Sequence, residues 1–185
     1  AVFPDDTDIP FHVIEEFWFY LTKNERQQDI RTPQKCVTDL TKMNDLSLFR
    51  DFSLSSKTAR LHDEVLACLR LEFTKLEMTK LNQSLIDAIH ETIEGKPWSE
   101  LSGDHQYGWK FILHHAEQAG QTDLVNELLT DFRWLKGKLK ETDVLLLQRD
   151  YHSSHLERDA RSVGLAIDAS RQVLTRRKEA LALQL

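Results

Sequence analysis

Apolar residues recur at intervals of three and four along most of this chain, which is the spacing that places side chains on one face of an α-helix. Phe11, Ile14, Trp18 and Leu21 show the pattern near the start, and similar stretches continue towards the end. Glycine and proline number only six and four in 185 residues, too few for a protein built from many β-turns. The sequence therefore predicts a mainly α protein.

The first half is predicted to hold three helices. Asp8 is expected to cap the first, with Pro10 in its opening turn. A polar stretch over Lys23–Arg31 leads to Thr32-Pro33, which begins the second. The third is expected to run without a break from Glu64 and to end by Gly95.

The second half is predicted to be a series of short helices. Asp104 is expected to cap a helix that ends at Gly120, and Gln121 or Thr122 opens the next. Thr142 or Asp143 starts a further helix, and the last one buries an apolar stripe after Leu156. Short turns between successive helices favour antiparallel hairpins, so we expect an α-helical bundle or a short helical-hairpin solenoid.

Two short strands are predicted between the second and third helices. Leu46, Leu48 and Phe52 lie at even spacings, and a serine-rich turn separates them from a second run, Lys57–Leu61. Two strands after helices are typical of the wing of a winged-helix unit. Because the apolar stripe of the third helix shifts near Thr79-Lys80, we predict a winged-helix domain over residues 1–78 and an α-helical domain over 79–185.

Charge and composition limit the class of protein. The formal net charge of −6 disfavours non-specific nucleic-acid binding, which needs cations to neutralise phosphates. Cys36 and Cys68 fall within helical patterns and are expected to be buried thiols, as in a cytoplasmic protein. The longest apolar runs, Phe17–Leu21 and Val144–Leu147, are too short to cross a membrane. The missing initiator methionine suggests a fragment of a longer polypeptide.

The triplet Leu61-His62-Asp63 lies between the second predicted strand and the third helix. A histidine at such a junction can donate an N–H to a phosphate at its edge, and the following aspartate can cap the helix. The alternative is structural, because aspartate before a helix is common and a neighbouring histidine often only stabilises the fold.

Residues 1–10 (AVFPDDTDIP) and the Leu61-His62-Asp63 triplet resemble the winged-helix domain of the apoptotic protease-activating factor family of signal-transduction ATPases (NB-ARC, AP-ATPase or STAND proteins). The triplet stands where that family has a Met-His-Asp-type motif, with Leu61 in place of the usual methionine. Trp109–Gly120 and Leu124–Leu139 resemble the helical domain that precedes the WD-repeat propellers. Residues 70 to 102 and the last helix match loosely.

The resemblance implies a regulatory and interaction role within a larger protein. His62 would contact the β-phosphate of ADP held by a separate P-loop domain, and Asp63 would orient His62 or cap its helix. The helical domain would relay the nucleotide state to a C-terminal sensor domain of the WD-repeat class. The resemblance also implies ADP or ATP as the parent's cofactor, oligomerisation in the active state and a role in apoptosis-like signalling.

The chain alone is not expected to be an enzyme. None of its glycines forms the G-x-x-x-x-G-K-[ST] phosphate cradle, so only the parent would be an ATPase, and we expect weak or no nucleotide binding by this part alone. No metal site is expected either. His114 and His115 point about 100° apart on a helix, and His152-x-x-His155 lacks a surrounding ligand pattern.

Other functions stay open on the sequence alone. A DNA-binding winged-helix regulator would use Pro33–Met43 as its recognition helix, but this stretch carries Lys35 and Lys42 against Asp39 and has no arginine to read guanine. A helical scaffold and an enzyme with an unrecognised site are further alternatives. The basic residues of the last helix indicate a solvated face or a docking surface for a neighbouring domain.

Overall fold

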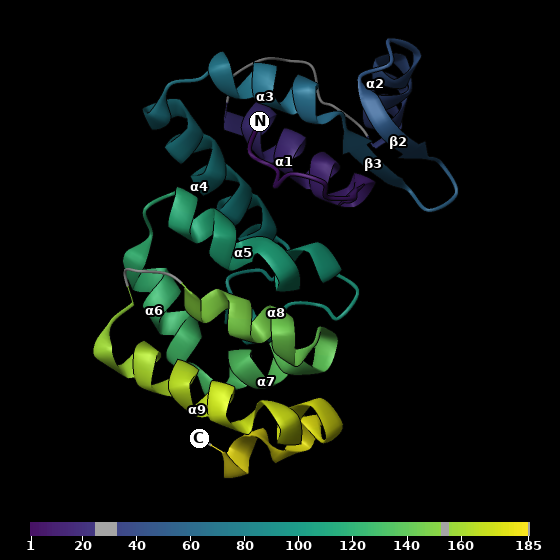
Figure 1. The fold of residues 1–185 in the computed structure, drawn as a ribbon. Helices are drawn as coiled ribbons and strands as arrows, with labels where there is room; N and C mark the ends of the chain where they lie inside the picture. Colours follow the sequence, from purple (N-terminus) through teal and green to yellow (C-terminus); the bar gives the residue numbers. More distant parts are fainter. Residues whose placement is uncertain (25–32, 153–155, 185) are drawn as a thin grey trace. The chain divides into compact units, whose positions relative to one another are not determined.

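The computed structural model describes residues 1–24, 33–152 and 156–184, and it confirms a mainly α protein with a small antiparallel sheet (Figure 1). The chain divides into two compact units, Ala1–Glu91 and Thr92–Leu185. Most of the polar stretch predicted over Lys23–Arg31 lies outside the described residues. The boundary predicted after residue 78 and the winged-helix assignment stay predictions.

The first unit contains four α-helices and a three-stranded sheet among its described residues. In chain order they are β1 (Ile9–Pro10), α1 (Phe11–Asn24), α2 (Pro33–Asp45), β2 (Phe49–Ser53), β3 (Thr58–Leu61), α3 (Asp63–Leu71) and α4 (Lys75–Glu91). The sheet order is β1-β3-β2, with both pairs antiparallel. The two predicted strands are therefore present as a hairpin.

The third strand, β1, was not predicted, and it corrects the expected start of the first helix. Pro10 pairs with Thr58 in the sheet and does not lie in a helical turn. The helix begins at Phe11, whose N–H donates to the carbonyl of Lys57 at 2.8 Å. Proline is tolerated here because β1 is an edge strand. Asp8 does not act as the expected cap, and its carboxylate accepts from Arg60 instead.

The helix predicted to run without a break from Glu64 is two helices, α3 and α4. The chain leaves helical geometry after Leu71 and re-enters it at Lys75. Thr74 and Glu77 form a capping box: the Thr74 N–H donates to Glu77 Oε2 at 2.8 Å, and the Glu77 N–H donates to Thr74 Oγ1 at 3.3 Å. The apolar stripe predicted along this helix is interrupted at the break, where Phe73 and Leu76 are exposed and not buried.

Replacing Thr74 with alanine should lower the free energy of unfolding of the chain by about 1 kcal/mol, because the first turn of α4 loses its side-chain acceptor. Urea denaturation followed by circular dichroism measures the change. Thr74→Ser should retain most of the stability, and Lys75→Ala, at the neighbouring exposed position, is the matched control. Equal losses in Thr74→Ala and Lys75→Ala would show that the capping box contributes nothing.

Aromatic residues join the sheet of the first unit to its helices. The Phe11 ring stacks on Phe52 with centroids 5.4 Å apart, and Phe52 stacks on Phe49 at 5.5 Å. Phe3 meets Phe17 edge to face at 6.3 Å. Because four of these five rings are buried, they hold α1 and the β2–β3 hairpin in one core.

The second unit consists of helices alone within its described residues. They are η1 (Trp98–Glu100), α5 (Gln106–Gln118), α6 (Thr122–Thr130), α7 (Phe132–Glu141), α8 (Val144–Arg149), η2 (Asp150–His152), α9 (Arg158–Arg176) and η3 (Lys178–Leu183). Each helix from α5 to α9 packs on the next, and α6 also packs on α9 (Figure 1). This arrangement agrees with the predicted bundle of short helices.

The helix ends of the second unit follow most of the predicted signals. Gly120 has φ of +72°, and the Gln121 N–H donates to the Ala116 carbonyl at 2.8 Å, as in a glycine-terminated helix. Asp143 caps α8, accepting from two backbone N–H groups. Asp104 was wrongly predicted as the cap of α5, because His105 Nδ1 accepts from the Gly108 N–H at 3.0 Å.

The core of the second unit encloses an ion pair. Nζ of Lys138 on α7 contacts Oδ2 of Asp150, and their side chains are 0% and 5% exposed. Burial lowers the pKa of Lys138 and raises that of Asp150, and the opposite charge of each partner acts against the shift of the other. Trp134 stacks on Trp109 beside this pair, with ring centroids 4.6 Å apart.

A second buried polar pair lies within α5. Tyr107 Oη and His115 Nε2 are 2.8 Å apart, and both residues are buried. Burial lowers the pKa of His115 to about 3, with a smaller contribution from neighbouring His114, and it raises the pKa of Tyr107. His115 is thus a neutral residue of the core at neutral pH.

Candidate functional site

His62 lies where β3 ends and α3 begins, as the sequence predicted. Its N–H donates to the Leu48 carbonyl at 3.3 Å, and its own carbonyl accepts from the Leu66 N–H at 3.0 Å. The backbone, with φ of −62° and ψ of 142°, is that of an N-cap residue. The ring is partly exposed, and it makes no capping hydrogen bond among the described residues. Its backbone is therefore fixed from both sides while its ring is accessible.

Asp63 is the first residue of α3 and is exposed, so the N-cap position falls on His62 and not on Asp63. Asp63 and Glu64 place two carboxylates in the first turn. These charges interact favourably with the positive end of the helix dipole, and they oppose a second anion at the same backbone amides.

Arginines of the hairpin near His62 are paired with the aspartates of residues 5–8. Arg60 on β3 donates to Asp6 at 2.7 Å and to Asp8 at 2.9 Å, and Arg50 on β2 donates to Asp6 at 3.2 Å. The hydrogen bond from Arg60 lowers the pKa of Asp8. The positive charge of both arginines is therefore balanced within the unit.

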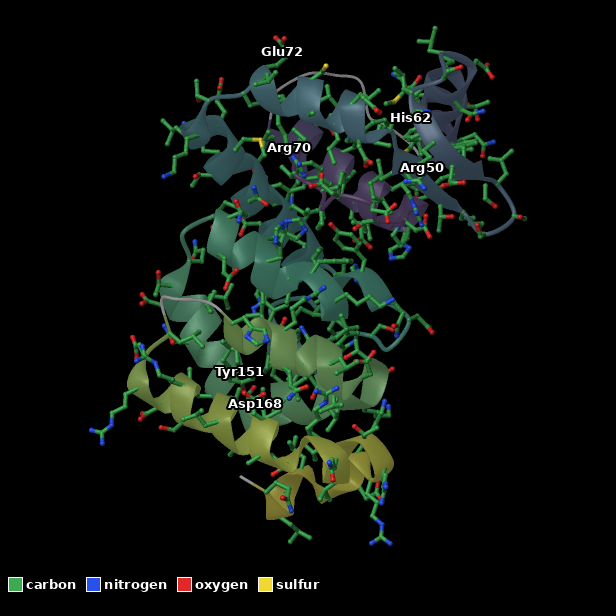
Figure 2. The ribbon with its side chains drawn as sticks, in the orientation of Figure 1. Arg50, His62, Arg70, Glu72, Tyr151 and Asp168 are labelled. Atoms are coloured by element: carbon green, nitrogen blue, oxygen red, sulfur yellow. The ribbon has the colours of Figure 1, made fainter. Side chains whose placement is uncertain are left out.

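Arg70, towards the other end of α3, binds the N-terminal segment with three donors. It donates to the Ala1 carbonyl at 3.2 Å, the Phe3 carbonyl at 2.9 Å and Asp5 Oδ1 at 2.7 Å. Figure 2 labels both residues: His62 immediately precedes α3, and Arg70 lies near the end of that helix. This contact could not be predicted from the sequence, because a segment without periodicity gives no signal of its partner.

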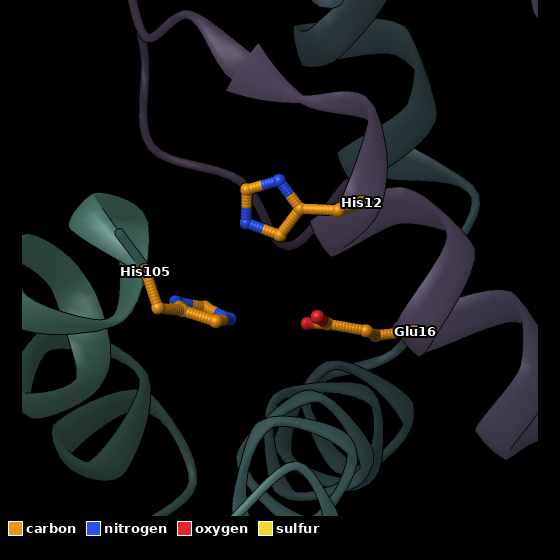
Figure 3. Close-up of side chains that lie close together, drawn as sticks. All are labelled: His12, Glu16 and His105. Atoms are coloured by element: carbon orange, nitrogen blue, oxygen red, sulfur yellow. The ribbon is translucent and has the colours of Figure 1, made fainter. Parts of the chain in front are cut away.

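The other histidines singled out by the sequence lie in different surroundings. The His114 and His115 rings meet at 77°, and His115 is committed to Tyr107 in the core. His152 is exposed in η2, and His155 lies outside the described residues. His12 was not singled out by the sequence; on α1, it and Glu16 extend from successive turns (Figure 3).

The helix predicted for DNA recognition over Pro33–Met43 is α2, and its charges are balanced. Lys35 and Lys42 stand against Asp39 and Asp45, and Lys42 Nζ lies 3.4 Å from Asp39 Oδ1. A helix without excess positive charge releases few counterions from DNA. This geometry gives no support to the DNA-binding alternative.

The cysteines divide between the interior and the surface. Cys36 is buried in α2 as expected, whereas Cys68 is exposed on α3. The prediction for Cys68 was wrong because Leu66 is the buried residue of α3, and Cys68, two residues further on, points to the opposite face of the helix. Among the described helices, none combines the length and the apolar character that a membrane crossing requires.

Residues 78–166 match the family model of the APAF-1 helical domain, which supports an APAF-1-like helical domain in this part of the chain. The match covers just under half of the chain and extends from α4 into α9. It includes residues 78 to 102, where the sequence resemblance was loose. No curated protein and no solved structure matches the chain.

Proposed function

We propose that this chain is a regulatory and interaction part of an APAF-1-like signal-transduction ATPase. The observation that carries the proposal is the match of residues 78–166 to the APAF-1 helical domain. In this account, a separate P-loop domain of the same polypeptide holds ADP or ATP in the cytoplasm. The first unit senses ADP, and the helical domain relays the nucleotide state to a C-terminal sensor domain of the WD-repeat class.

His62 is the proposed sensor of the ADP β-phosphate. Its partly exposed ring at a fixed backbone position supports this role, because the ring needs little reorganisation to meet a phosphate. A hydrogen bond between an imidazole and a charged phosphate contributes about 1.5–3 kcal/mol. That energy is enough to bias a two-state domain equilibrium by about tenfold or more. Asp63, adjacent in α3, is proposed to orient His62.

Replacing His62 with alanine in the full-length parent should speed ADP dissociation by about tenfold and raise oligomerisation in the absence of a signal. The physical reason is the loss of one contact made only in the closed, ADP-bound arrangement. Release of a fluorescent ADP analogue measures the rate, and light scattering measures the assembly.

The matched control is His152→Ala, since His152 is an exposed histidine of the other unit. Its ADP dissociation rate should equal that of the unchanged protein. An unaltered rate in His62→Ala would remove His62 from the mechanism, and it would leave the helical-domain match intact. Tight ADP binding by residues 1–185 alone would contradict the assignment of the nucleotide to a separate domain.

A further inference from the structure

A groove of about 560 Å³ lies within the second unit, between η1 and α7. Residues from η1, α5 and α7 line it, among them Glu100, Trp109, Phe132, Arg133, Lys136 and Gly137. All of these residues belong to one compact unit. His62 belongs to the first unit, and no residue of that unit lines the groove.

The inner wall of the groove is rigid. A Cβ atom on Gly137 would lie 2.6 Å from Cη2 of Trp109, so the indole ring rests directly on the backbone of α7. Trp109 is buried and stacked on Trp134, so close packing holds its ring in place. A ligand would therefore meet a preformed surface and would not need to order it.

Positive charge is concentrated on α7 beside this wall. The helix carries Arg133, Lys136, Lys138 and Lys140 against the single acidic residue Glu141. Lys138 is paired with Asp150 in the core, and Lys140 Nζ lies 2.7 Å from Glu141 Oε1.

Arg133 and Lys136 are exposed, and they make no ion pair with any described residue. The preceding helix, α6, contains Asp123 and Glu127 and no basic residue. Arg133 and Lys136 are therefore two exposed cations on the groove without an ion-pair partner among the described residues.

The groove also presents an apolar ring to solvent. Phe132 begins α7 next to Arg133, and it is 40% exposed. A ligand that satisfies both features carries carboxylates and an apolar group close together. We propose that this groove binds an acidic peptide segment of a partner protein, with carboxylates on Arg133 and Lys136 and one apolar side chain against Phe132.

Glu100 on η1 gives the site a direction. Glu100 and Ser99 of η1 both line the groove, and η1 packs on α7. The Glu100 carboxylate repels other carboxylates on this side of the groove. Glu141 at the end of α7 also lines the groove but is paired with Lys140. The carboxylates of the peptide must therefore lie against Arg133 and Lys136, while a neutral side of the peptide faces Glu100. Removing this charge with Glu100→Gln should strengthen binding by about twofold.

The test uses the full 185-residue chain and a fluorescein-labelled peptide of aspartate and glutamate residues around one phenylalanine. Fluorescence anisotropy at low salt gives the dissociation constant. Arg133→Gln combined with Lys136→Gln should weaken binding by about tenfold, because two charge pairs are lost. The matched control is Arg171→Gln combined with Arg176→Gln, which removes equal charge from exposed positions on α9 and should leave the affinity almost unchanged.

The inference is overturned if the labelled peptide does not bind, or if both double variants weaken binding equally, since net charge alone would then explain the result. Full displacement of the peptide by inorganic phosphate, at matched ionic strength, would also overturn it in favour of a phosphate site. Loss of binding in a peptide with alanine in place of phenylalanine would support the contact with Phe132. None of these outcomes depends on ADP or on His62.

Discussion

Replacing Lys138 with methionine should lower the free energy of unfolding of the second unit by about 3–5 kcal/mol, because Asp150 is left as an uncompensated charge in the core. Urea denaturation followed by tryptophan fluorescence measures the loss. A Trp18→Phe background keeps the signal specific, since the remaining tryptophans, Trp98, Trp109 and Trp134, all lie within residues 92–185.

The double variant separates the pair from its surroundings. Lys138→Met with Asp150→Leu replaces both charges by apolar groups and should recover most of the stability, since the cost of burying two ions offsets most of their attraction. Lys140→Met, on the exposed side of α7, should change the stability by no more than about 0.5 kcal/mol. If the double variant were less stable than Lys138→Met, the charges would not be acting as a pair.

Lowering the pH from 7 to 5 should lower the free energy of unfolding of the second unit by about 2 kcal/mol through His115 alone. Its pKa is lowered from 6.5 to about 3 by burial in the folded state. The unfolded chain therefore takes up a proton at this site below pH 6.5, while the folded chain does not until the pH approaches 3. The stabilisation is complete above pH 6.5 and is lost as the pH falls.

Replacing His115 with glutamine should remove this pH dependence. The amide is neutral at every pH in the range and offers a partner to the Tyr107 hydroxyl, so the stability at pH 7 should fall by only about 1 kcal/mol. Urea denaturation at pH 7, 6 and 5 measures the slope. His152→Gln, at an exposed position, should retain the original slope. A slope that persists in His115→Gln would assign the pH dependence to another group.

Local signals in the sequence predicted most of the fold. Apolar spacing located the helices, and Gly120 adopts the positive φ that ends α5. The errors arose where a local rule competes with tertiary pairing. Pro10 is compatible with a helix start, but pairing with Thr58 places it in the sheet. The capping box at Thr74 was readable from the sequence, yet the apolar stripe on both sides of it suggested continuity.

The candidate sites were predictable to different degrees. The position of His62 at a strand-to-helix junction followed from the pattern around it, whereas its role rests on the family and on a domain elsewhere in the polypeptide. The pairing of Lys138 with Asp150 could not be predicted, because charges at this separation give no periodic signal. The groove was not predictable either, since it depends on the approach of Trp109 to Gly137 across two helices.

The three donors of Arg70 have a mechanical consequence for α3. The Arg70 guanidinium donates to two carbonyls and one carboxylate of residues 1–5. Any displacement of that segment must therefore either move α3 with it or break all three hydrogen bonds. The N-terminal segment and the end of α3 are therefore tied together by a single side chain, and replacing Arg70 would release both at once.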